Sequence, residues 1–526
     1  MASKIASLFS PSETASKDQH ENVAEDLELG TASSQSDGIH ETNSEYDEKK
    51  REESPEVIDI SNLISSDHPA HPQNWHWAKR WSIVFMFCLM QIYVIWTSNG
   101  FGSIEYSVMA QFNVSAQVAT LCLSMNILGS GLGPMFLGPL SDIGGRKPVY
   151  FCSIFVYTVF NISCALPRNI VQMIISHFII GVAGSTALTN VAGGIPDLFP
   201  EDTAGVPMSL FVWACAGGAI GAPMATGVDI NAKYGWRWLY YINIIVGGFF
   251  LIVILIIPET LPIKVITRYE NAKGRIVEGI PKNNLKEVLK KCKFVTTMGF
   301  RMMLTEPIIL SMGLYNFYAY GISYFFLTAI WPVFYDTYKM SEMGASCTYL
   351  SGFVASTLLF LYQPIQDWIF RRDKAKNNGV ARPEARFTSA LFITLLFPAG
   401  MFLFAFTCHP PFPWMSPIVG NSMVTVANGH NWMCILNYLT DSYPLLSGSA
   451  VAAFTLPSFI GATVFAHVSQ IMFNNMSVKW AVATMAFISI SIPFIIYTFY
   501  FFGQRIRALS SLTGNKALKY LPLENN

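Results

Sequence analysis

The chain has 526 residues, of which 52% are hydrophobic and 13% are charged, with 34 basic and 34 acidic side chains. A typical soluble domain carries about 25% charged residues. This composition excludes an ordinary water-soluble protein, and the formal net charge of zero gives no reason to expect a nucleic-acid partner.

The N-terminal residues 1–79 are rich in Ser, Glu, Asp and Asn and lack hydrophobic periodicity, which predicts a disordered tail that is either regulatory or simply solvated. They contain no apolar stretch followed by a cleavage site, so the first spanning segment must act as the insertion signal. The nine cysteines form no C-x-x-C pair and have no histidines at metal-ligand spacing. We therefore expect neither a metal site nor a cofactor.

Apolar runs of the length that crosses a bilayer follow in two groups of six, separated by a basic stretch. The expected organisation is a tail (1–79), a six-helix bundle (80–258), a cytosolic linker (259–306), a second six-helix bundle (307–502) and a C-terminal tail (503–526). The runs cover residues 81–101, 114–137, 149–166, 170–195, 207–228 and 238–257, then 308–334, 346–365, 387–406, 417–439, 445–471 and 480–502.

Lys and Arg gather in alternate short loops, which by the positive-inside rule places both termini in the cytosol. Two glycosylation sequons, at Asn113 and Asn475, fall in loops on the opposite side. Within the linker, residues 285–293 place apolar side chains on one face of a helix and lysines on the others. Such a helix either lies on the inner leaflet or packs under the bundle.

Two loops at equivalent points of the two halves match each other, which indicates an internal repeat. In each loop an Asp precedes two cations by four and five residues, so the carboxylate can pair with them and with the positive end of a neighbouring helix. The loops read GPLSDIGGRK at 138–147, with Gly138, Asp142, Gly145, Arg146 and Lys147, and QPIQDWIFRR at 363–372, with Asp367, Arg371 and Arg372; a second match is Asp197-x-x-Pro with Asp441-x-x-Pro.

These motifs resemble the major facilitator superfamily and, more narrowly, its fungal family of twelve-span drug:proton antiporters. Ile143 departs from the superfamily's loop motif, and Gly221-Ala222-Pro223 departs from the family's antiporter motif. The narrower resemblance rests on Pro72-Gln-Asn-Trp75, Tyr234-Gly-Trp-Arg-Trp238, Pro258-Glu-Thr260 and Asn437-Tyr-Leu-Thr-Asp441.

The resemblance implies an all-α integral membrane protein with the major facilitator fold, about twelve transmembrane helices in two six-helix bundles. It also implies a small-molecule substrate, the proton gradient as energy source, and the plasma membrane in preference to the vacuolar membrane. We expect a monomer in the lipid bilayer.

Few ionisable groups lie within the expected spans, and they are the candidates for proton coupling. His177 stands where family members usually have an arginine, and histidine can bind and release a proton near neutral pH. Glu105 lies just beyond the expected outer end of the first span and can accept a proton from the acidic side. A buried, hydrogen-bonded histidine remains the alternative for His177, and a structural role is favoured for His430 and His467.

Polar side chains at helical spacing mark a candidate substrate cavity in the second half. Asn316, Tyr320 and Tyr324 share one helix face, and Asn421, Asn428 and Trp432 share another. No Asp or Glu lies deep in any expected span, which favours a neutral or weakly charged, hydrogen-bonding solute over a polyamine. Tight packing of aromatic rings and satisfied amides is the alternative.

Three functions remain open from sequence. Within the family the chain is similar to a vitamin B6 (pyridoxine) uptake symporter, and a multidrug:proton antiporter on the same fold is the second candidate. A non-transporting nutrient sensor is the third. We find no G-x-S-x-G, H-E-x-x-H or G-x-G-x-x-G motif and expect no enzyme. Because only the first half keeps the loop glycines, we expect conformational coupling there and substrate recognition in the second half.

Overall fold

The computed structural model describes residues 57–59, 68–200, 203–231, 233–278, 285–377, 382–443, 446–510 and 512–513. The chain forms two compact units. The larger comprises residues 77–259 and 283–526 and contains the membrane helices; the smaller comprises residues 1–76 and 260–282. Most of the expected tail and parts of the linker lie outside the described residues.

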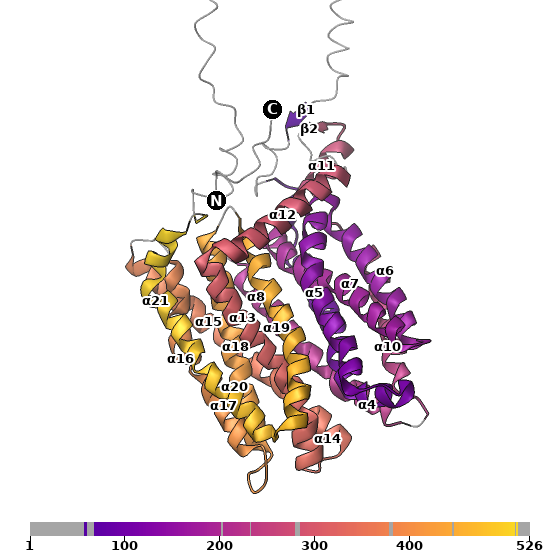
Figure 1. Cartoon of the computed structure of the whole chain (residues 1–526). Coiled ribbons are helices and arrows are strands. Elements are labelled where there is room, and N and C mark those ends of the chain that lie inside the picture. Colours follow the sequence, from indigo (N-terminus) through magenta and orange to yellow (C-terminus); the bar gives the residue numbers. More distant parts are fainter. Residues whose placement is uncertain are drawn as a thin grey trace, which may run out of the picture. The chain divides into compact units, whose positions relative to one another are not determined.

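In the larger unit the first half supplies six spans, of which the fifth is interrupted by one 3-10 turn (Figure 1). The elements are α4 (Trp77–Phe112), α5 (Ala116–Gly144), α6 (Arg146–Ala165), α7 (Ile170–Leu198), α8 (Gly205–Gly217), η2 (Gly218–Ile220), α9 (Gly221–Asp229) and α10 (Arg237–Ile256).

The second half is more segmented. Its elements are α13 (Pro307–Ile330), η3 (Trp331–Thr337), α14 (Glu342–Cys347), α15 (Leu350–Lys376), η4 (Pro383–Phe387), α16 (Ala390–Ile393), α17 (Leu396–Thr407), α18 (Met415–Ser442), α19 (Ser447–Asn475), α20 (Val478–Ser489) and α21 (Ser491–Leu509).

Eleven segments of the described chain are long and apolar enough to cross a membrane. The fourth span of the second half, α18, has 28 residues but carries four asparagines and a histidine, which makes it less apolar than the others. With α18 as the twelfth span, the expected all-α membrane fold with two six-helix groups is confirmed.

Two spans differ from their expected limits for identifiable reasons. The first, expected to end at residue 101, continues to Phe112, and the polar side chains of this extension, Glu105 and Ser107, make hydrogen bonds to neighbouring helices. The expected run 387–406 is broken between α16 and α17. Pro398 has no N–H to donate to the carbonyl of Thr394, and the helix is interrupted at that turn.

Small residues let the helices approach closely in both halves. A Cβ on Gly181 of α7 would lie 2.1 Å from the carbonyl oxygen of Asn126 in α5. In the second half, a Cβ on Gly461 of α19 would lie 2.0 Å from the carbonyl oxygen of Phe317 in α13. The two halves meet where α5 packs against α19 and α8 packs against α15 (Figure 1).

The linker contributes one helix to the membrane unit, α12 (Leu285–Thr305), which packs against α5 and α19. Cys292 is buried and its thiol donates to the carbonyl of Phe136 at 3.6 Å. Leu289, expected on the same apolar face, is 58% exposed. The helix therefore packs by one edge of its apolar face and leaves the other edge open.

The smaller unit joins the N-terminal segment to the linker. Strand β1 (Val57–Asp59) pairs in parallel with β2 (Ile276–Glu278), next to α11 (Pro262–Ala272) and the 3-10 turn η1 (Pro72–Asn74). Glu270 accepts from Arg275 at 3.0 Å and lies 3.2 Å from His68 Nε2. The hydrogen bond from the Arg275 guanidinium holds the pKa of Glu270 below its usual value, so this contact is formed at neutral pH.

Candidate functional site

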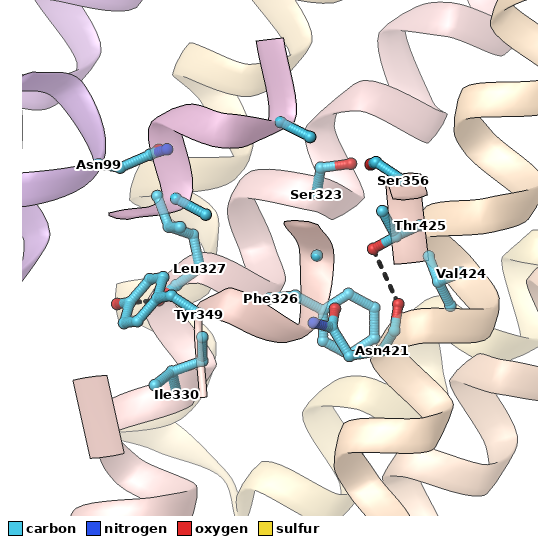
Figure 2. A pocket seen from close by; sticks show the side chains of 13 residues that line it. Asn99, Ser323, Phe326, Leu327, Ile330, Tyr349, Ser356, Asn421, Val424 and Thr425 are labelled. Atoms are coloured by element: carbon cyan, nitrogen blue, oxygen red, sulfur yellow. Dashed lines mark hydrogen bonds between the residues drawn. The ribbon is translucent and has the colours of Figure 1, made fainter. Parts of the chain in front are cut away.

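A pocket with a volume of about 220 Å³ lies between the two halves of the membrane unit (Figure 2). Ten of its thirteen lining residues come from the second half, so this half supplies most of the wall. The first half contributes Asn99, Ala216 and Ala219, and the second contributes Ser323, Phe326, Leu327, Ile330, Tyr349, Gly352, Ser356, Asn421, Val424 and Thr425.

The described lining of this pocket combines apolar walls with neutral hydrogen-bonding groups and contains no Asp, Glu, Lys or Arg. Asn421 donates its side-chain N–H to the hydroxyl of Ser351 at 3.1 Å. The oxygen of the same side-chain amide is left for a ligand. Figure 2 shows Asn99 on the opposite wall from Asn421. Amides on two walls can orient a small polar molecule from both sides.

Aromatic side chains from both halves meet beside one end of the pocket. Tyr349 donates its hydroxyl to the carbonyl of Leu327 at 2.9 Å and is buried (Figure 2). Beyond it, Tyr106 of α4 meets Trp331 edge to face, with ring centroids 6.4 Å apart. These rings come from opposite halves, so this end opens only if the halves separate there.

Glu105 lies in α4 on the same side as this aromatic closure. Its carboxylate is buried and accepts from the Thr120 hydroxyl of α5 at 2.6 Å. Gly102, one helical turn before it, faces the Tyr349 hydroxyl, since a Cβ there would lie 3.8 Å from that oxygen. Asn99, six residues before Glu105, lines the pocket, a separation of about 9 Å along the helix axis. The candidate proton carrier therefore lies near the pocket but not in its wall.

His177 lies within the first half, away from the described pocket lining. Its Nδ1 donates to the carbonyl of Met173 at 2.9 Å, and its Nε2 lies 3.1 Å from the Tyr240 hydroxyl. The side chain is 2% exposed and packs edge to face against Phe101. Both ring nitrogens thus have partners when the imidazole is neutral.

Of the six expected cavity residues, Asn421 lies in the described pocket wall and the other five do not. Asn428 donates to the hydroxyl of the lining residue Ser323 at 3.0 Å. Asn316 donates to the carbonyl of Phe454. Tyr320 and Tyr324 contact each other with centroids 5.5 Å apart, and Trp432 packs against the core of the second half.

The first-half loop motif forms a charge network around Arg146. The guanidinium donates to Asp142 at 2.9 Å and to Asp197 at 3.1 Å. Lys147 donates to the carbonyl of Leu255 at 2.7 Å. Asp142 and Asp197, the two landmarks of the sequence repeat, are thus joined through a single buried arginine.

Glu259 completes this network. In the sequence it belongs to the motif Pro258-Glu-Thr260, which contributes to the family resemblance, and nothing else there marks it as a functional residue. Its two carboxylate oxygens accept from the backbone N–H groups of Arg146 and Lys147 at 2.9 and 3.2 Å, capping the start of α6. Gly145 precedes them at φ 101° and ψ 152°, a conformation that only glycine adopts readily. A Cβ added to Gly138 would meet no neighbour within 4 Å, so this glycine plays no comparable part.

In the second half the equivalent arginine is not one of the two expected from the loop. Arg386, near the start of the third span as Arg146 is, donates to Asp441 at 3.1 Å and stacks on Phe370. Arg372 of the loop stacks on Trp368. Asp367 lies beside Gly205 at the start of α8, since a Cβ there would be 3.4 Å from its carboxylate. The position of Arg386 before the third span is the sequence signal that could have identified it.

The other two histidines of the spans also make hydrogen bonds. His430 Nε2 contacts the Ser389 hydroxyl at 2.9 Å inside the second half. His467 of α19 contacts Gln117 and Ser124 of α5, each at 2.9 Å, and so joins the two halves. In the described part of the chain no group of three or more His, Cys, Asp or Glu side chains is placed to hold a metal ion.

Two groups of six spans with a pocket between them, lined by apolar side chains and neutral hydrogen-bonding groups, are the arrangement of a membrane transporter. The family model of the Major Facilitator Superfamily matches residues 83–466. The chain belongs to this superfamily.

Relatives and solved structures agree with this placement. An uncharacterized transporter of Schizosaccharomyces pombe is 44% identical over 93% of this chain and 94% of its own length. The citrinin biosynthesis cluster transporter of Monascus ruber is 29% identical over 87% of this chain and 93% of its own. The proton:xylose symporter XylE, bound to 6-bromo-6-deoxy-D-glucose, shares the fold with a TM-score of 0.58 at 15% identity, over 82% of this chain and 96% of its own.

Proposed function

We propose that this protein is a proton-coupled secondary transporter of a small neutral or weakly charged organic solute. The observation that carries the proposal is the pocket between the halves, whose described wall offers amides, hydroxyls and aromatic rings but no charged side chain. A strongly cationic or anionic solute would lose its hydration there without gaining a counter-charge. A neutral solute with several hydrogen-bonding groups loses little.

Glu105 is the proton carrier in this proposal. Burying a carboxylate within a membrane span costs free energy, so a carboxylate found there commonly serves a function. It lies one turn beyond Gly102, which faces Tyr349 in the pocket wall, so a change in its charge can act on the closure of the pocket. His177 is the second candidate, although its two nitrogens are already bonded within the first half.

Uptake by symport is the direction that we propose, at the plasma membrane and by a monomer with both termini in the cytosol. Pyridoxine is the first substrate to test, because it is an aromatic solute with several hydroxyl groups and fits the chemistry of the wall. The resemblance to a vitamin B6 symporter supports this choice.

Uptake in a fungal strain that lacks its own pyridoxine carrier tests the proposal. Expression of this chain should give radiolabelled pyridoxine uptake that a protonophore abolishes, and Glu105→Gln should remove accumulation while His177→Gln retains most of it. Uptake of pyridoxine that persists after the proton gradient is collapsed would contradict proton coupling. Retained accumulation in Glu105→Gln with loss in His177→Gln would assign the proton role to His177 instead.

Export of xenobiotics or secondary metabolites by proton antiport is the second candidate. It is favoured by the relative whose name places it in a citrinin biosynthesis cluster. In the same strain, lowered accumulation and raised resistance across a drug panel, without pyridoxine uptake, would select this function. A nutrient sensor would show neither flux.

A further inference from the structure

We propose that Trp213 is the gate that closes the pocket on the side of Asp367, opposite the Tyr106–Trp331 closure. Trp213 belongs to α8 of the first half. Its indole N–H donates to the Thr357 hydroxyl of α15, in the second half, at 2.9 Å. The proposal concerns the path to the pocket and holds whichever solute is carried.

Aromatic contacts strengthen this bridge between the halves. The Trp213 ring lies against Phe353 with centroids 4.9 Å apart and reaches Phe360 at 6.4 Å. Both phenylalanines belong to α15, so one side chain of the first half is held at three points by one helix of the second. Such tilted ring contacts add to the energy of simple burial.

The order of contacts along α8 and α15 places Trp213 between the pocket and the loop of Asp367. Near one end of this seam, Gly217 approaches Phe353. At the other end, Gly205 approaches the Asp367 carboxylate. Trp213 lies between these two contacts in sequence, and α8 is helical throughout, so it also lies between them in space.

The pocket begins directly beyond this bridge. Ala216, three residues or about 4.5 Å along α8 from Trp213, lines the pocket. On α15 the lining residue Ser356 directly precedes Thr357. A solute that moves from the pocket toward the Asp367 side along this seam therefore meets the indole ring first, and the halves must release it for the path to open.

The expected increase in the open fraction depends on the contacts that each variant removes. Trp213→Phe and Thr357→Val each remove the hydrogen bond between these two side chains, which should raise the open fraction on the Asp367 side about five-fold. Trp213→Phe also leaves a smaller ring against Phe353, and Thr357→Val also removes the bond from the Thr357 hydroxyl to the Phe353 carbonyl. Trp213→Ala also removes the ring contacts, and the increase should be roughly ten-fold or more. The double variant Trp213→Phe/Thr357→Val should show less than the sum of the two single effects in free energy, because both substitutions remove the same bond.

The test measures access to a pocket cysteine and needs no known substrate. Ser356→Cys is placed in a background in which the exposed Cys152 and Cys347, and the partly exposed Cys215 near Trp213, are replaced by alanine. A membrane-impermeant maleimide is added to right-side-out or inside-out vesicles, and the labelling rate is compared across the gate variants. Trp480→Ala, which removes a 57% exposed tryptophan away from the described pocket wall, is the matched control.

The expected result is faster labelling in the gate variants from one face of the membrane only, the face of the Asp367 loop, with the control unchanged. Equal labelling rates in Trp213→Phe and the parent would overturn the proposal, as would acceleration from the opposite face or additive effects in the double variant. If Trp213→Ala fails to give a monodisperse protein, the two conservative variants decide. Because no solute flux is measured, failure here is distinct from failure of proton-coupled transport.

Discussion

Replacing Gly145 with alanine should destabilise the membrane unit far more than the same change at Gly138, although both belong to one loop motif. Gly145 has φ 101° and ψ 152°, a region in which a side chain costs about 1–3 kcal/mol. The new Cβ would also lie 2.7 Å from the Glu259 carboxylate oxygen and 3.3 Å from its carbon.

The close approach of the new Cβ to Glu259 adds a second destabilising contribution. Displacement of Glu259 would release the backbone N–H groups of Arg146 and Lys147, and loss of a helix cap of this kind costs about 1 kcal/mol. Together the two effects give about 2–4 kcal/mol. Gly138 lies inside α5 with nothing within 4 Å of an added Cβ, so alanine there should be neutral or stabilising by up to about 1 kcal/mol.

Thermal unfolding of the purified protein in detergent, followed by tryptophan fluorescence and by loss of the monodisperse species, measures the difference. We expect a clear fall in midpoint temperature for Gly145→Ala and no fall for Gly138→Ala. Equal midpoints for the two variants would refute the account of this loop, and so would a larger fall for Gly138→Ala.

Three further outcomes follow from the site. Arg146→Ala should cost up to about 3 kcal/mol in the same unfolding assay, because the Arg146 side chain is only 10% exposed and both Asp142 and the part-buried Asp197 lose it as their partner. The more exposed Arg386→Ala should cost less than about 1 kcal/mol, and equal costs would contradict this. Glu105→Gln should abolish accumulation of solute against a gradient but retain counterflow, with Thr120→Val as the control that removes only the hydrogen-bond donor. Asn421→Ala should raise the KM for solute about five-fold with little change in maximal rate, since it removes one hydrogen bond to the solute; an unchanged KM would exclude Asn421 from the binding site.

The membrane fold could be predicted from sequence because hydropathy depends on residues that are close together in the chain. The exception is α18, whose asparagines lower its apolarity, yet its length and its place in the repeat identify it as a span. Ends of spans were less predictable. The first span is expected to stop near residue 101 but continues to Phe112, since sequence does not reveal that the Glu105 carboxylate finds a hydrogen-bond partner in Thr120.

The pocket was less accessible to sequence reasoning than the fold. Asn421 was visible as part of the polar stripe of its helix, and it lines the wall. Asn99 and Ser356 gave no periodic signal, because the wall is built from single residues of several helices whose juxtaposition depends on packing. Trp213 was likewise unnoticed, since a tryptophan in an apolar run is ordinary until its partner on α15 is known.

The loop network shows the same limit in a different way. Asp142 and Asp197 were recognised as repeated landmarks, but the repeat alone did not show that Arg146 joins them. In the second half, the loop motif predicted Arg371 and Arg372 as the cations of the charge network. The ion pair to Asp441 is instead made by Arg386. Position relative to the next span would have identified the partner, whereas spacing from the Asp did not.

The most direct test of proton-coupled transport is solute accumulation in proteoliposomes that contain only the purified protein. An imposed pH gradient, acidic outside, should drive radiolabelled pyridoxine or another neutral solute of the panel above its equilibrium level. A protonophore and Glu105→Gln should each reduce this to simple equilibration. Accumulation that is indifferent to the pH gradient, or equilibration alone in the unmodified protein under a full gradient, would contradict the proposed coupling.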